Sequence, residues 1–190
     1  MKIATVALLC VGLGVTACAS TPPPLNFTPP NINVVQRQQP VALVSTIVTI
    51  GRPDEAVGSI EVAGMENELQ QLWKSSLEDS VTRMAIFNDS APTRVNLNVK
   101  VLKLDVPAFG ASMTTQTVAR YELLDRNTGA VVFTTDVQSD GMVPMDYNFV
   151  GAIRARESAS RSVQNNIATF LQRLEAADLS RVQFASPRGQ

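Results

Sequence analysis

Histidine is absent from this sequence of 190 residues, which removes the most common metal ligand and the most common general base. Cysteine is almost absent, since only Cys10 and Cys18 occur, both near the N-terminus. A zinc or iron–sulfur site would therefore have to be built from carboxylates alone. The sequence predicts no metal site and no cofactor.

An excess of charge of either sign is also missing. The chain has 16 Lys and Arg residues against 17 Asp and Glu residues, and its net charge is −1. Nucleic-acid binding needs clustered cations to neutralise phosphates, and a polybasic membrane patch needs the same. The sequence contains no such cluster, so we expect no nucleic-acid partner.

Catalytic motifs are missing as well. The serines lack the Gly-x-Ser-x-Gly elbow of a nucleophile. The adjacent acids form three pairs, but neighbours in sequence do not place two carboxyl groups across a cleft, as a glycosidase requires: Glu66 with Glu68, Glu78 with Asp79, and Asp136 with Asp140. We therefore expect a protein that is not an enzyme.

The longest apolar run is at the N-terminus. It follows Lys2, covers residues 3–15, and is too short for a permanent membrane span, so it indicates a secretory signal. The four residues that close it resemble the bacterial lipoprotein box: Val15, Thr16, Ala17 and Cys18.

This resemblance implies that Cys18 becomes the first mature residue and carries a diacylglycerol thioether and an acylated amine. Several acyl chains on one residue hold a protein stably on a membrane. In such lipoproteins an Asp after the lipidated cysteine retains the protein in the inner membrane. Ala19 and Ser20 follow Cys18 here, which favours the outer membrane, with the domain facing the periplasm.

Ala17, Cys18 and Ala19 also fit ordinary signal cleavage, with the chain released after Ala19. Three features favour lipidation. Cys18 directly follows the apolar run, and a proline-rich segment that we expect to be a disordered tether comes after it. No second cysteine remains downstream, so without lipidation Cys18 would be an unpaired thiol in an oxidising compartment.

The composition changes along the chain and predicts four parts. Residues 1–17 are the signal peptide. Residues 18–40 are rich in proline and predict an extended tether of about 3 Å per residue. Residues 41–177 predict one folded domain, and residues 178–190 a flexible tail.

The periodicity of the domain predicts six elements. A β-branched run over 41–50 predicts a strand, which we expect to be central because both of its faces are apolar. A helix begins near Met65, and a second covers about 152–177. Three strands lie between them, with a bulge where the alternation changes phase at Val101 and Leu102 and a hairpin turn over 125–129.

This order of strand, helix, three strands and helix predicts an α+β two-layer sandwich. We expect a four-stranded, mostly antiparallel sheet with both helices packed on one face.

Together with the lipoprotein box, four further features resemble the YajG-like lipoproteins: the proline-rich segment, the alternating run from Val95 to Val99, the turn at Asn127 to Gly129 and the final Ala/Ser-rich helix. More loosely, this layout is similar to the lipopolysaccharide-assembly lipoprotein and to the auxiliary lipoproteins of ABC transport systems. These families imply no catalytic residues.

The segment 141–151 is unusually apolar for a loop. Contiguous exposed apolar residues often mark a partner site, so four of them form a candidate partner surface: Met142, Met145, Tyr147 and Phe149. Alternatively, the loop folds over the end of the sheet and completes the core. Trp73 has the same two interpretations.

Two functions follow. The first is a non-enzymatic accessory or assembly factor of the bacterial envelope, anchored to the outer membrane through Cys18 and presented to an envelope protein. The second is a binding module for an acyl chain or similar amphiphile, which would need an apolar cavity of several hundred Å³.

Overall fold

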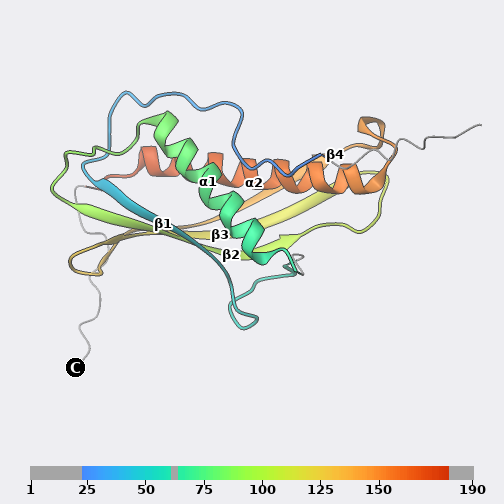
Figure 1. Cartoon of the computed structure of the whole chain (residues 1–190), viewed down its shortest axis with the longest axis horizontal. Helices are drawn as coiled ribbons and strands as arrows, with labels where there is room; N and C mark the ends of the chain where they lie inside the picture. The colour runs from blue at the N-terminus through green and yellow to red at the C-terminus, as the bar shows by residue number, and fades with distance from the viewer. Residues whose placement is uncertain (1–22, 61–63, 180–190) are drawn as a thin grey trace, which may run out of the picture.

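The computed structural model describes residues 23–60 and 64–179. Both helices cover the same face of one sheet, which confirms the predicted two-layer α+β arrangement (Figure 1). In chain order the elements are β1 (Ala42–Ile50), α1 (Glu66–Met84), β2 (Arg94–Asp105), β3 (Met113–Asp125), β4 (Val131–Val143), the short 3₁₀ helix η1 (Met145–Tyr147) and α2 (Gly151–Ala176).

The sheet has the strand order β1-β2-β3-β4. β1 is parallel to β2, while β2, β3 and β4 form the predicted antiparallel meander. The pairing of β2 with β3 shifts register between Val101 and Lys103, so the predicted bulge is confirmed at Leu102. At the predicted hairpin turn, Gly129 adopts a φ of 70°, a conformation that glycine reaches without steric cost.

The predicted central position of β1 is wrong, because β1 forms one edge of the sheet. Only one of its faces is covered by α1, and Ile47 on the other face is 51% exposed. A run of β-branched residues satisfies the strand conformation at either position. The run therefore predicted the strand but not its place in the sheet.

β4 is longer than expected and includes the start of the predicted 141–151 loop. Gly141 pairs with Thr115 and Val143 pairs with Met113. α2 approaches the sheet so closely here that a Cβ on Gly141 would overlap the carbonyl oxygen of Ser158 and the backbone nitrogen of Ser162. The small residues Ser158 and Ser162 of α2 thus allow this close approach.

Polar side chains line this contact between α2 and the sheet. The hydroxyl oxygens of Thr117 and Ser162 are 2.7 Å apart, and the Tyr121 hydroxyl donates to Asn166 Oδ1 at 2.8 Å. All four residues are fully buried. Buried polar groups are paired in stable proteins, and such pairs fix how the helix is placed along the strands.

Residues 23–40 lie against the helix layer, which differs from the expected extended tether over 18–40. Phe27 is fully buried and meets Trp73 edge to face, with ring centroids 5.9 Å apart. Near the other end, Gln39 Nε2 donates to the carbonyl oxygens of Leu174 and Ala177 at 2.7 and 3.0 Å. Figure 1 shows this segment, in blue, running along the helices before β1.

Residues 23–40 pack on the domain because their prolines are interspersed with apolar side chains that the core can bury. The predicted tail over 178–190 is described only at its start, where Leu179 is buried. Within the ranges 23–60 and 64–179, no helix combines the length and the apolar character that crossing a bilayer requires.

Candidate functional site

The lipoprotein box at Val15, Thr16, Ala17 and Cys18 lies outside the described residues, so lipidation at Cys18 stays a prediction. The structure does show where the first described residues, from Pro23 on, lie on the domain. Arg156 Nε donates to the carbonyl oxygen of Pro23 at 3.1 Å, and Asn26 N donates to Ser160 Oγ at 3.2 Å. The first described residues are therefore fixed beside the N-terminal half of α2.

The candidate partner surface at Met142, Met145, Tyr147 and Phe149 is exposed to solvent. Met142 lies near the end of β4, and Met145 and Tyr147 belong to η1. In this segment Val143 is fully buried and Met142, Met145, Phe149 and Val150 are not, so the segment does not complete the core in the way the alternative interpretation required. Whether a partner binds there stays a prediction.

Arg161 of α2 holds this surface in place. Its guanidinium lies 5.2 Å from the ring centroid of Tyr147, and its Nη1 donates to the carbonyl oxygen of Met142 at 3.1 Å. Its Nε donates to Glu157 at 2.7 Å. A cation over an aromatic ring favours one orientation of that ring, so the surface has a defined shape.

Of the two interpretations of Trp73, a partner contact or a core residue, the structure supports the core residue. It is fully buried under Phe27, and it also lies near Tyr121, whose pKa is raised by burial, while the indole of Trp73 opposes that rise. The Tyr121 ring stacks on Phe170 at 4.1 Å between centroids.

A second exposed apolar feature shares Phe149 with the candidate partner surface and adds Phe109, which the sequence reasoning missed. Phe109 and Phe149 are 87% and 89% exposed, the two highest values among the large hydrophobic side chains described, and Val150 is also exposed. We refer to Phe109, Phe149 and Val150 as the apolar tip. Phe109 lies in the connection between β2 and β3, where no periodic signal identifies it.

Arg154 joins the two loops of the apolar tip. Its Nη1 donates to the carbonyl oxygen of Asn148 at 2.6 Å, and its Nη2 donates to that of Gly110 at 3.0 Å. The side chain is buried. A guanidinium with several fixed donors can hold two backbone segments at once, so Arg154 determines the spacing of these loops.

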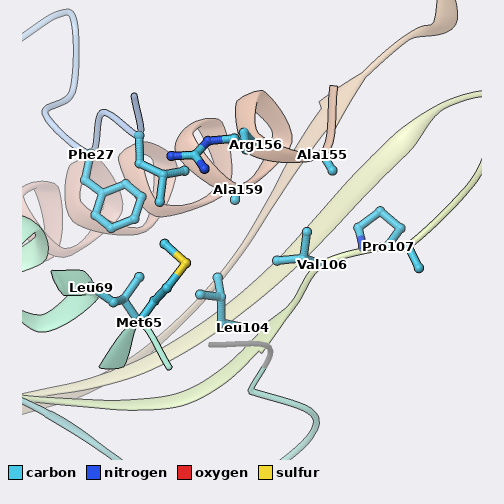
Figure 2. Close-up of a pocket in the computed structure, with 11 residues that line it drawn as sticks. Phe27, Met65, Leu69, Leu104, Val106, Pro107, Ala155, Arg156 and Ala159 are labelled. Carbon is cyan, nitrogen blue, oxygen red and sulfur yellow. The ribbon is translucent and has the colours of Figure 1, made fainter. Parts of the chain in front are cut away.

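An apolar groove of about 300 Å³ opens between the helices and the sheet (Figure 2). Figure 2 shows Phe27 and Ala159 on one side, Met65 and Leu69 on another, and Leu104 and Val106 along the sheet. Four segments supply its lining: Leu25 and Phe27 before β1, Met65 and Leu69 around the start of α1, Leu104 and Val106 to Ala108 at the end of β2, and Ala155, Arg156 and Ala159 of α2. Its volume is at the lower end for ligand pockets.

Arg156 is the one charged residue among those that line the apolar groove. Its Nε is occupied by the carbonyl oxygen of Pro23. The groove therefore combines apolar walls with a single cation near the point where the described chain begins, an arrangement suited to a molecule with an apolar chain and a polar or anionic end.

Among the described residues, several acids are engaged by neighbouring cations, as Asp136 and Asp79 are. Arg120 donates to both oxygens of Asp136 at 2.6 and 2.7 Å, and these hydrogen bonds lower the pKa of Asp136. Arg83 pairs with Asp79 at 2.8 Å. In the part of the chain that the structure describes, no group of three or more acids or cysteines could hold a metal ion.

No family model matches the chain, and no curated protein matches it by sequence. Its fold is similar to that of a Xanthomonas campestris protein of the DUF330 family, at 11% identity and a TM-score of 0.53, over 78% of this chain and 90% of that one. A minor lipoprotein from Acinetobacter baumannii is similar at 10% identity and a TM-score of 0.37, over 75% of this chain and 96% of that one.

At these identities the comparisons show a shared fold and nothing about activity, and the second TM-score is too low for any argument. The resemblance to YajG-like lipoproteins is not confirmed by them. The chain adopts an α+β fold that also occurs in the DUF330 protein.

Proposed function

We propose that this protein is a lipoprotein of the bacterial envelope that acts as a non-enzymatic accessory or assembly factor. Lipidated Cys18 holds it on the outer membrane, and its domain faces the periplasm and an envelope protein. The observation that carries the proposal is the lipoprotein box from Val15 to Cys18, which directly follows the apolar run.

The domain supports a role in binding more than one in catalysis. Its hydroxyl groups between α2 and the sheet are buried and bonded to each other, as with Thr115 and Ser158 at 2.7 Å, and so are not presented to a substrate. By contrast, Met142, Met145 and Tyr147 form an exposed surface of defined shape. Flexible methionines beside an aromatic ring suit a protein partner.

The anchoring is tested by changing Cys18→Ser in cells fed an alkyne fatty acid. We expect the native chain to incorporate the label and Cys18→Ser to lose it, because the thiol is the attachment point. Cys10→Ser is the matched control and should keep the label, since Cys10 lies in the segment that is removed. An unlabelled native chain that begins at Ser20 would show ordinary secretion instead.

The partner surface is tested by placing a photoactivatable amino acid at position 147 in intact cells. We expect a crosslink to a defined envelope protein, lost when Met142 and Met145 are changed to Ser. Position 127, exposed in the hairpin turn between β3 and β4, is the control and should give no such product. Equal products from both positions would contradict a specific surface.

One observation favours the second candidate function, a binding module for an acyl chain or similar amphiphile. The apolar groove lies between the sheet and the helices and has a volume of about 300 Å³, as this function requires. The core around it is otherwise filled by buried side chains, so the groove accommodates part of a ligand and not a whole lipid.

A further inference from the structure

The apolar tip sits at one end of the molecule, where both of its loops are free of charge. The sequence from Val106 to Met113 contains no charged residue, and neither does the sequence from Tyr147 to Ile153. Figure 1 shows the β2–β3 connection and the segment before α2 at the same end of the sheet. Two phenylalanines here project into solvent, 87% and 89% exposed.

The buried side chain of Arg154 holds these two loops in place. Arg154 binds the carbonyl oxygens of Gly110 and Asn148, each next to one phenylalanine of the tip. Asn148 Oδ1 also accepts a hydrogen bond from Val150 N at 2.8 Å. Phe109 and Phe149 therefore project from two braced loops that a single buried side chain joins.

The chain toward Cys18 leaves from the same end. Residues 23–40 run along α2 from its N-terminal half, where Arg156 binds Pro23, to its C-terminal end, where Gln39 binds Leu174. Cys18 and Pro23 are five positions apart in the sequence. An extended chain spans at most about 3.6 Å per residue, so five residues reach no farther than about 18 Å from Pro23.

We propose that the apolar tip enters the lipid surface to which Cys18 is anchored. This inference rests on the proposed anchoring. The short link keeps the tip beside the bilayer, and aromatic side chains on an uncharged surface are favoured at the membrane interface. It also assigns Phe149 to the membrane contact, apart from Met142 and Tyr147, which Arg161 contacts.

The occupant is a lipid surface because the tip is small and carries little that would specify a protein. The residues that adjoin Phe109 are small and uncharged: Ala108, Gly110 and Ala111. A contact of this kind needs no complementary shape, and it fixes the orientation of the domain when combined with the anchor at Cys18.

The test places an environment-sensitive nitrobenzoxadiazole fluorophore on single cysteines in the full, processed chain. The predicted thioether leaves Cys18 without a thiol, so labels at Phe109→Cys, Phe149→Cys and Asn127→Cys are specific. The chains are reconstituted in vesicles of phosphatidylethanolamine and phosphatidylglycerol that contain a lipid with a spin-label quencher near the headgroup. Position 127 is the control, in the turn between β3 and β4.

We expect several-fold stronger quenching and a blue-shifted emission at positions 109 and 149 relative to 127. Chains that float with the vesicles and give equal quenching at all three positions would overturn the inference, leave the anchoring intact and point to a protein as the occupant of the tip. Chains that do not float would overturn the anchoring through Cys18, and this inference with it.

Discussion

Gly141 shows how one residue sets the distance between the two layers of this protein. It lies in β4 opposite Thr115, and the backbone of α2 at Ser158 and Ser162 occupies the space where a side chain would begin. On either side of this contact, Thr115 bonds to Ser158 and Thr117 bonds to Ser162. These hydroxyl pairs form because α2 lies this close to the sheet, and a larger distance between the two layers would separate them.

We predict that Gly141→Ala lowers the free energy of unfolding by about 2 to 3 kcal/mol, the upper part of the range for overpacked sites. The added methyl group meets backbone atoms, which cannot turn aside as a side chain would. The measurement is the unfolding midpoint in urea.

Gly151→Ala is the control for that substitution. Its Cβ would meet only Met113 Cε, at an ordinary contact distance of 3.5 Å, at the start of α2. We expect its unfolding midpoint to remain near that of the native chain. A Gly141→Ala variant as stable as the control would mean that α2 does not pack this closely.

At the scale of elements, the segment before β1 acts as a clasp over the two helices. Val35 N donates to the carbonyl oxygen of Met84 at 2.9 Å, at the end of α1, while Arg156 and Gln164 of α2 bind Pro23 and Asn26. Residues 23–40, which the sequence predicted to be a tether, therefore contact both α1 and α2. Their docking also shortens the distance between the domain and Cys18.

We predict that Phe27→Ala lowers the free energy of unfolding by about 3 kcal/mol, as for other buried phenylalanines. Phe27 is fully buried against Trp73, and its removal opens a cavity next to the apolar groove. A free tether would give no change. The unfolding midpoint in urea measures the effect.

Val34→Ala provides the comparison within the same segment. Val34 is 69% exposed, so its truncation removes little packing. If both variants unfold at the midpoint of the native chain, residues 23–40 do not belong to the cooperative unit.

At the scale of the whole molecule, three features meet at one end: the apolar groove, the apolar tip and the point where the chain leaves toward Cys18. Pro107 and Ala108 line the groove directly before Phe109 of the tip. A lipid surface at the tip would therefore also lie beside the groove. The opposite face of the sheet is different, since it carries ion pairs such as Lys100 with Glu55 at 2.6 Å.

This arrangement predicts that the groove takes an acyl chain from the adjacent bilayer. A vesicle lipid with a diazirine on its acyl chain should crosslink to the chain at residues of the groove, such as Leu104 and Met65, as mapped by peptide mass spectrometry. Ala155→Phe should fill the groove and reduce these crosslinks several-fold.

Ala152→Phe is the matched variant, because Ala152 lies on the same helix, is exposed and does not line the groove. It should leave the crosslinks unchanged. If Ala155→Phe also leaves them unchanged while its unfolding midpoint is native-like, the groove does not hold an acyl chain.

Local pattern was sufficient to predict the elements of this protein. Alternation placed the strands and the bulge at Leu102, and the Asp125 to Gly129 turn was predicted from residues whose own backbone preferences form it. The periodicity that begins near Met65 predicted the helix α1. Each of these depends on residues near one another in sequence, and so the fold class was predicted correctly.

The tertiary structure alone decided which segments meet. The edge position of β1 depends on what covers its outer face, and the docking of residues 23–40 depends on a site between two helices that the segment does not contain. The apolar groove needs four segments, and the apolar tip needs Arg154 to join two loops. By itself the sequence determined the strands, the helices and the predicted anchor at Cys18. Contacts between residues distant in sequence, which leave no periodic signal, decided that the groove and the tip lie at the end of the domain where the described chain begins.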